Sequence, residues 1–197
     1  MPANISFTRD MLVESAFRLV RSRGIDRLSA RTLAKDLNCS TQPIYSNFKS
    51  MRKLDMELRK KAVDTLLRYQ TTPRTGQVFF DMGLGYIQFA RRERHLFRFL
   101  YGGSKRGRSG GYGKALKEFG FQNLLQRMKD DPNLEGLDEK QMESVLTKMW
   151  IFVHGVAFLS INNAFAEGND DYLKAMLMET GLSIVDGEKA KQSSKSS

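Results

Sequence analysis

Residues 28–48 read LSARTLAKDLNCSTQPIYSNF, and this stretch decides the fold. Ser29 is a good N-cap residue for a short helix whose apolar side chains recur at helical spacing as far as Asn38. Ser40 offers a second N-cap directly afterwards, and Pro43 fits the first turn of another helix, where amides have no intrahelical partner to lose. The stretch therefore predicts two short helices joined by a tight turn.

Longer helices are predicted on both sides of this pair. Apolar spacing indicates a helix over residues 8–23, and Gly24 is placed to take a left-handed conformation at its C-terminal end. A fourth helix is predicted from residue 50 or 51 to residue 69. Strand-like alternation is almost absent, so we expect an all-α fold.

The remainder of the chain divides at a polar break over residues 70–76, which contains Pro and Gly. Further helices are predicted over residues 77–94, 95–101, 115–128, 138–166 and 171–185. The Gly-rich residues 102–113 lack the Gly-Lys-Ser/Thr ending of a phosphate loop and are predicted to form a mobile linker. We expect a first domain over residues 1–70, a second over residues 71–187 and a disordered tail over residues 188–197.

The charge balance favours a polyanionic partner. The chain has 32 Lys and Arg against 22 Asp and Glu, a net charge of +10. Residues 1–70 hold 14 of these basic and 7 of these acidic residues, so +7 of the excess lies there. Neutralising phosphates is a common use of such an excess, although basic residues can also simply solvate helix faces.

Several classes of protein are disfavoured by composition. Charged residues interrupt the apolar runs, so no membrane span is expected, and no secretory signal opens the chain, which leaves the cytoplasm. Cys39 is the single cysteine and cannot form an internal disulfide. His95 and His154 lie far apart without a nucleophile paired to either, so we expect no enzyme activity, no cofactor and no metal.

Two short helices in basic surroundings are the minimal device for placing a recognition helix in the major groove of DNA. Apolar residues such as Leu33, Ile44 and Phe48 can fix the angle between the two helices. Polar residues such as Arg31 and Gln42 then remain exposed on them. The pattern indicates a helix-turn-helix that binds double-stranded DNA.

The same stretch resembles the signature of the tetracycline-repressor (TetR) family. The resemblance covers roughly residues 9–56 and is carried by eleven positions: Gly24, Leu28, Ser29, Leu33, Ala34, Leu37, Ser40, Ile44, Tyr45, Phe48 and Leu54. It implies an N-terminal three-helix helix-turn-helix DNA-binding domain followed by a helical effector-binding and dimerisation domain. It also implies that the helix over residues 40–47 enters the major groove.

The resemblance carries DNA-binding roles to particular residues. Gln42 is the best candidate for reading a base, because a carboxamide can pair bidentately with adenine. The full set of implied DNA-binding residues is Ser29, Arg31, Thr32, Thr41, Gln42, Tyr45, Ser46, Asn47, Lys49, Arg52 and Lys53. Asn47 stands where the family usually has His and can still donate to a phosphate. Met51 stands where it usually has Lys, so Arg52 or Lys53 must supply that charge.

The second half resembles TetR effector domains more loosely, through Ala-Arg-Arg-Glu-Arg-His-Leu-Phe at residues 90–97 and Trp-x-x-x-His-Gly at residues 150–155. The resemblance implies a pocket for a small, mostly apolar effector, although about half of its residues can equally be plain core. The implied lining residues are Phe89, Phe97, Leu100, Phe121, Leu125, Trp150, His154 and Phe158.

The two last long helices show wider apolar faces than a lone hairpin can bury, which predicts a homodimer. The resemblance then implies a repressor on a palindromic operator, released when an effector shifts the fourth helix. A helical interaction protein of the same fold that no longer binds DNA is the alternative, because Met51 removes a phosphate contact.

Overall fold

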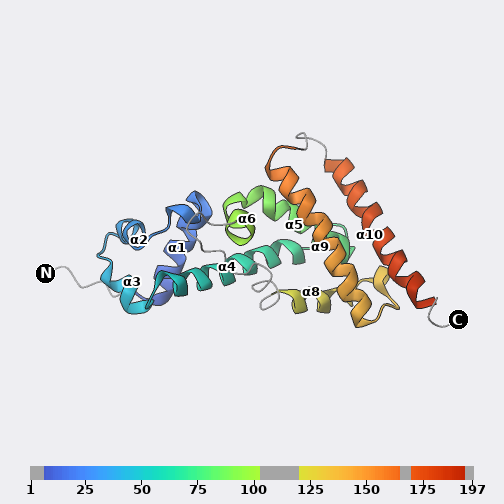
Figure 1. Cartoon of the computed structure of the whole chain (residues 1–197), viewed down its shortest axis with the longest axis horizontal. Helices are drawn as coiled ribbons and strands as arrows, with labels where there is room; N and C mark the ends of the chain where they lie inside the picture. The colour runs from blue at the N-terminus through green and yellow to red at the C-terminus, as the bar shows by residue number, and fades with distance from the viewer. Residues whose placement is uncertain (1–6, 103–119, 165–169, 194–197) are drawn as a thin grey trace. The chain divides into compact units, whose positions relative to one another are not determined.

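The computed structural model describes residues 7–102, 120–164 and 170–193, and every regular element in those residues is helical (Figure 1). In chain order the elements are α1 (Arg9–Arg23), η1 (Ile25–Arg27), α2 (Ala30–Asp36), α3 (Gln42–Asn47), α4 (Met51–Thr71), α5 (Val78–Arg92), α6 (Arg94–Tyr101), α8 (Phe121–Met128), η2 (Pro132–Leu134), α9 (Glu139–Ile161) and α10 (Asp170–Ser193). The all-α prediction is confirmed. The predicted linker beyond Gly102 and residues 115–119 of a predicted helix lie outside the described residues.

The chain forms two compact units, and each is discontinuous in sequence. The first consists of Met1–Asp64 and Glu93–Leu116, and the second of Thr65–Arg92 and Lys117–Ser197. This division differs from the predicted one at residue 70 in two respects. The boundary lies inside α4, and α6 groups with the N-terminal helices rather than with the second domain.

The first unit is built on α1, which packs against α2 and α6. The Thr8 side chain accepts a hydrogen bond from the Met11 amide and caps the start of α1. Gly24 ends the helix with a φ of 83°, a conformation that other residues rarely adopt. The core of the first unit is made of fully buried apolar residues from α1 to α4. They include Leu12, Ala16, Val20, Leu28, Leu33, Ile44, Phe48, Leu54 and Leu58.

Two charged contacts explain why α6 belongs to the first unit. Arg21 of α1 pairs with the buried carboxylate of Glu93, the residue that precedes α6, and its Nε donates to Glu93 Oε2 at 2.8 Å. Arg59 of α4 donates to Asp55 at 2.9 Å and to the Phe99 carbonyl of α6 at 3.1 Å. Neither contact could be inferred from sequence, because the partners are 72 and 40 residues apart.

The second unit is a helical bundle in which α5 packs against α8, α9 and α10, and α9 packs against α10. The end of α4 approaches α5 closely at Gly85, because a Cβ at this position would lie 2.1 Å from the Tyr69 carbonyl oxygen. The buried carboxylate of Asp131 accepts a hydrogen bond of 2.7 Å from the Phe79 amide in the first turn of α5. A side chain 52 residues away thus satisfies an amide that this helix end leaves free.

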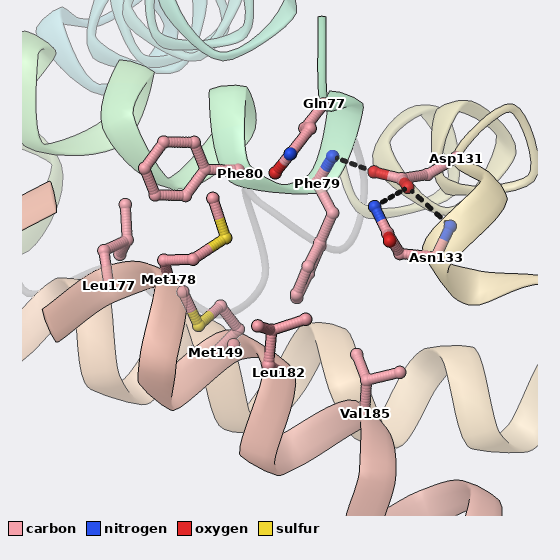
Figure 2. Close-up of a pocket in the computed structure, with 11 residues that line it drawn as sticks. Gln77, Phe79, Phe80, Asp131, Asn133, Met149, Leu177, Met178, Leu182 and Val185 are labelled. Atoms are coloured by element: carbon pink, nitrogen blue, oxygen red, sulfur yellow. Dashed lines mark hydrogen bonds between the residues drawn. The ribbon is translucent and has the colours of Figure 1, made fainter. Parts of the chain in front are cut away.

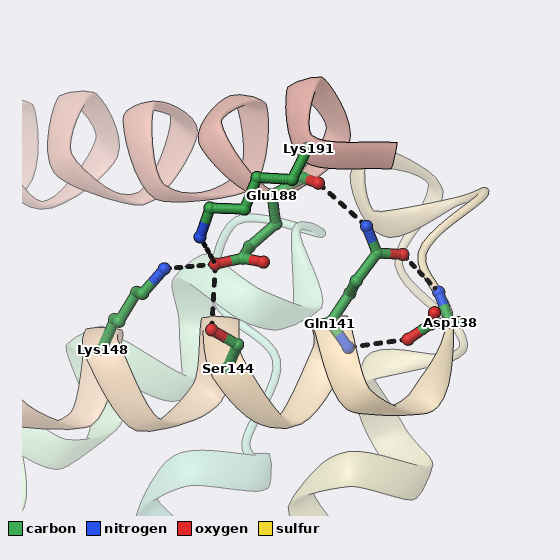
Figure 3. Close-up of polar contacts among 6 residues, drawn as sticks. All are labelled: Asp138, Gln141, Ser144, Lys148, Glu188 and Lys191. Atoms are coloured by element: carbon green, nitrogen blue, oxygen red, sulfur yellow. Dashed lines mark hydrogen bonds and ion pairs between the residues drawn. The ribbon is translucent and has the colours of Figure 1, made fainter. Parts of the chain in front are cut away.

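The C-terminal helix is longer than predicted, and the expectation of a disordered tail from residue 188 is wrong for residues 188–193. Glu188 is buried against α9, where its carboxylate accepts hydrogen bonds from Lys148, Lys191 and Ser144 (Figure 3). Gln141 also donates to the Glu188 carbonyl at 2.8 Å. These contacts fix a Lys- and Ser-rich segment whose composition alone indicates disorder.

Helix α9 bears on the expectation that no segment spans a membrane. Its 23 residues are long and apolar enough, by length and composition alone, to cross a membrane, whereas no such stretch was expected from the sequence. The core helix of a soluble protein passes the same test, and α9 buries residues such as Val145, Met149 and Val153 within the second unit.

Candidate nucleic-acid interface

The first turn of α2 is closed by a reciprocal cap. Ser29 Oγ accepts from the Thr32 amide at 3.1 Å, and Thr32 Oγ1 accepts from the Ser29 amide at 2.8 Å. Thr32 Oγ1 also donates to the Arg27 carbonyl at 2.8 Å. Both hydroxyls, predicted as DNA contacts, therefore have a structural task, while Arg31 beside them is exposed.

Helix α3 separates its apolar and polar sides as a recognition helix requires. Ile44 is fully buried, whereas Gln42 and Ser46 are exposed and Tyr45 is 53% exposed. Thr41, rather than Ser40, is the N-cap residue and is partly buried, but its side chain makes no capping bond. The exposed side of α3 thus presents a carboxamide, a phenol and a hydroxyl, groups that hydrogen-bond to base edges and phosphates.

Asn47 lies at the C-terminal end of α3 and has an internal role. Its Nδ2 donates to the Pro43 carbonyl at 2.8 Å and to the Phe7 carbonyl at 3.2 Å. An amide nitrogen carries two hydrogens, so these two bonds occupy both of them. In this conformation Asn47 fastens α3 to the residues before α1 rather than offering a donor to a phosphate.

Arg9 is a functional candidate that sequence reasoning did not single out. Its guanidinium lies 4.4 Å from the centre of the Phe48 ring, and it donates to the Asn47 carbonyl at 3.1 Å and to Glu57 at 2.8 Å. Arg9 therefore connects α1 to the end of α3 and to α4. Its position in the sequence gave no signal of this role, because the partners are 38 or more residues away.

The predicted phosphate-binding cations lie where α4 begins. Lys49, Arg52 and Lys53 are all exposed, while Met51 is only partly exposed. The two cations on the first turn of α4 are thus available for the role that Met51 cannot fill. Together with Arg31 they are exposed cations of the same compact unit as α3.

A second kind of exposed surface lies on α9 and α10. Ile151 is 61% exposed and Phe158 is 55% exposed, and their spacing places them with Gly155 on one side of α9. Leu159 of α9 and Tyr172 and Leu182 of α10 are also large apolar side chains left exposed. We call these five side chains and Gly155 the apolar face.

The chain resembles solved structures of TetR proteins. A single-site variant of TetR from Acinetobacter baumannii AYE in complex with minocycline matches with a TM-score of 0.55 and 19% identity, covering 93% of this chain and 97% of that one. TetR from the same organism gives 0.55 and 16%, with the same coverage. A possible TetR family transcriptional regulator from Streptomyces coelicolor A3(2) gives 0.52 and 17%, covering 93% of this chain and 99% of that one. The chain has the TetR fold.

The likeness is one of structure rather than of sequence. No known family model matches the chain, and no curated protein matches it. At 16–19% identity the structural neighbours establish the fold, so roles of single residues must come from their own surroundings.

The residues predicted to line an effector pocket in this TetR fold divide between the two units. Phe97 and Leu100 are buried in α6 of the first unit. In the second unit, Phe89 and Leu125 are buried, Phe121 and Trp150 are partly exposed, and Phe158 belongs to the apolar face. Within that unit the structure brings His154 and Trp150 together.

His154 forms the most specific polar contact among these residues. Its Nδ1 lies 2.8 Å from the hydroxyl of Tyr86, a buried residue of α5, and its ring centre lies 5.5 Å from that of Trp150. Burial lowers the pKa of His154 below its usual value, which favours the neutral imidazole at neutral pH. The Tyr86–His154 pair thus provides polar groups inside an aromatic region, as a ligand site requires. Sequence reasoning missed Tyr86.

The second unit also has a cavity that none of the predicted pocket residues lines (Figure 2). It measures about 30 Å³. Drug-sized ligands need pockets of roughly 300 to 1,000 Å³, so side chains must move before this cavity can accept one. Two flexible methionines, Met149 and Met178, lie at its wall. The apolar side chains beside them are those of Phe79, Phe80, Leu177, Leu182 and Val185.

Proposed function

We propose that this protein is a dimeric transcriptional regulator that binds a palindromic DNA operator through α3. The observation that carries the proposal is α3 itself, which anchors on a fully buried Ile44 and leaves Gln42, Tyr45 and Ser46 exposed. The net charge of +7 over residues 1–70 favours a phosphate-rich partner. The TetR fold supports the same function.

Each subunit supplies one recognition helix, and a palindrome needs two. The apolar face on α9 and α10 is the surface that a second copy covers, because large exposed apolar side chains are stabilised when they are buried. Gly155 has open space where a Cβ would stand, so another helix can approach closely there. Twofold pairing through this face relates the two DNA-binding units by symmetry.

A small, mostly apolar effector is proposed to control DNA binding. The aromatic surroundings of Tyr86 and His154 suit such a ligand, and the structural neighbour bound to minocycline shows that a protein of this fold accepts a small molecule. Repression, and release from DNA when the effector binds, are proposed from the resemblance to TetR regulators. A regulator of this kind works in the cytoplasm, and no enzyme activity is proposed.

The proposal is tested by selecting random duplex DNA with the purified full chain at two salt concentrations. We expect a palindromic motif whose affinity falls steeply as salt rises. Gln42→Ala should relax the motif at one base position per half-site. Gln122→Ala, which changes an exposed glutamine of α8, is the matched control and should leave the motif unchanged.

The opposite result has a defined meaning. Absence of an enriched motif and of salt-dependent binding would show that the chain is a helical interaction protein that has lost DNA binding. Met51 in place of a cation, and the internal bonds of Asn47, are the features that favour this alternative.

A further inference from the structure

Polar atoms that are shielded from water and have no hydrogen-bond partner among the described residues include two from different helices of the second unit. One is Oε1 of Gln70 in the last turns of α4, a residue only 7% exposed, and the other is Nε of Arg127 in α8. Buried polar atoms in native proteins are nearly always bonded, so unpaired ones require an explanation. Here both belong to residues that line the same cavity.

This cavity is formed where α4 ends, α5 begins and α8 passes by. It measures about 90 Å³, three times the volume of the cavity in Figure 2. It is lined by Gln70, Thr71, Thr72, Pro73, Gly76, Val78, Asp81 and Arg127, all of which belong to the second unit. A water molecule takes up roughly 30 Å³ in the liquid, so a molecule of a few heavy atoms fits.

The loop that closes the cavity is internally bonded. Asp81 is buried and accepts from the amides of Arg74 at 2.7 Å and Thr75 at 2.9 Å, and from the Thr75 hydroxyl at 2.8 Å. The Arg74 guanidinium donates to the Tyr69 carbonyl at 2.7 Å and to Gln88 at 3.2 Å. Asp81 thus already has its partners, whereas Gln70 and Arg127 each keep an unused atom.

The two unused atoms have opposite requirements. Gln70 Oε1 accepts a hydrogen bond and Arg127 Nε donates one. A carboxamide meets both, because its N–H groups donate and its carbonyl accepts, whereas a carboxylate has nothing to donate to Gln70 and is repelled by Asp81. The terminal torsion of glutamine is broad, so rotation about it can present Oε1 to a ligand.

We propose that this cavity binds a small molecule bearing a primary carboxamide, held between Gln70 and Arg127. We call it the amide site. None of the residues predicted for the effector pocket lines it, so the proposal does not depend on that pocket or on DNA binding. Because Gln70 lies on the helix that begins at Met51, operator affinity is a second quantity to measure once binding is established.

The test is a titration of the ¹⁵N-labelled full chain with acetamide, followed by NMR at the amides of Thr72 and Gly76. A ligand of four heavy atoms can bind only weakly, so we expect saturable shifts with a dissociation constant on the order of millimolar. Gln70→Leu and Arg127→Met should each weaken binding at least about fivefold, since each leaves one ligand group unpaired. Gln122→Leu in α8 and Lys129→Met at its C-cap, both at exposed positions, are the matched controls.

Three results would overturn the proposal: shifts that never saturate, equal acetamide affinity in Gln70→Leu, or binding of acetate as tight as that of acetamide. A crystal structure grown in acetamide in which ordered waters bridge Gln70 and Arg127 would do the same. Arg127→Met retains the apolar stem of a partly exposed side chain, so it tests the site even if Gln70→Leu does not fold.

Discussion

Helix α3 and helix α9 both leave side chains exposed, but the exposed chemistry is opposite. The exposed side of α3 carries Gln42, Tyr45 and Ser46, which keep their hydrogen-bonding groups in water. The exposed side of α9 carries Ile151 and Phe158, which gain nothing from water. The first surface suits a polar, charged partner read through hydrogen bonds, and the second suits an apolar surface. One chain thus has two exposed surfaces of opposite chemistry.

The largest effect is expected when the apolar face is made charged. Replacing Ile151 and Phe158 with Asp places two carboxylates in the proposed interface, where an unpaired charge costs about 3 kcal/mol or more. That corresponds to at least about a hundredfold weaker dimer. Analytical ultracentrifugation measures the dissociation constant, and Lys140→Glu, at an exposed position of the same helix, is the control. An unchanged dimer in the Asp variant would place the interface elsewhere.

On the polar surface, the largest single effect is expected from Gln42→Ala. Loss of a bidentate contact to a base costs about 1–3 kcal/mol in discrimination. Fluorescence anisotropy with the selected operator and with random duplex should show the loss for the operator alone, with an unchanged salt dependence. Equal losses on both duplexes would show that Gln42 contacts only the backbone.

A smaller loss is expected from Arg9→Met, which removes a positioning residue rather than a DNA contact. The bonds of Arg9 to Asn47 and Glu57 are lost, and α3 is held less firmly. We expect about tenfold weaker operator binding, equivalent to about 1.4 kcal/mol. The salt dependence should stay unchanged, because no phosphate contact is lost. A reduced salt slope would instead identify Arg9 as a phosphate ligand.

Replacing the cations at the start of α4 should change the salt dependence of DNA binding, which Arg9→Met leaves unchanged. Lys53→Met or Arg52→Met is expected to weaken operator and random duplex alike, with a change of about 0.9 in the slope of log affinity against log salt for each lost phosphate contact. The variant that changes the slope identifies the cation that compensates for Met51. If neither does, Lys49 and Arg31 remain as the phosphate ligands to test.

The smallest effect is expected on the stability of the fold, through the contacts of Glu188 between α10 and α9. Hydrogen bonds from Lys148, then from Lys191 and Ser144, lower the pKa of Glu188 from 4.5 to about 2. A lowered carboxyl pKa stabilises the fold above the ordinary pKa and loses that effect as pH falls through the folded one. The stability advantage of the wild type over Glu188→Gln should therefore shrink between pH 4.5 and pH 2, measured by thermal unfolding. Glu179→Gln, at an exposed position of α10, should show no such change.

The helix-turn-helix was predictable because its signals are local. The cap at Ser29, the Pro in the first turn of α3 and the apolar frame through Ile44 lie within about twenty residues of sequence. The parts that sequence reasoning missed depend on contacts distant in sequence. Grouping of α6 with the first unit depends on Arg21 and Glu93, and the order of residues 188–193 depends on Lys148 and Glu188.

The binding roles were less predictable than the helices. Asn47 was assigned to a phosphate by its place in the motif, but the structure gives both of its hydrogens to carbonyl groups. The pocket residues share only an aromatic character, which is equally typical of core, and they divide between two units. Charge and capping are readable one residue at a time, whereas a cavity depends on how several helices pack.

The discontinuity of the first unit has a consequence during synthesis on the ribosome. A chain folds from its N-terminus as it emerges, yet α1 lacks its contact with α6 until residues 94–101 have been made. Between those two events the 28 residues of Thr65–Arg92 must emerge, and these belong to the other unit. The first unit therefore cannot be completed by the nascent N-terminal segment alone. A fragment that stops at Asp64 should expose the side of α1 that α6 covers and should depend on chaperones.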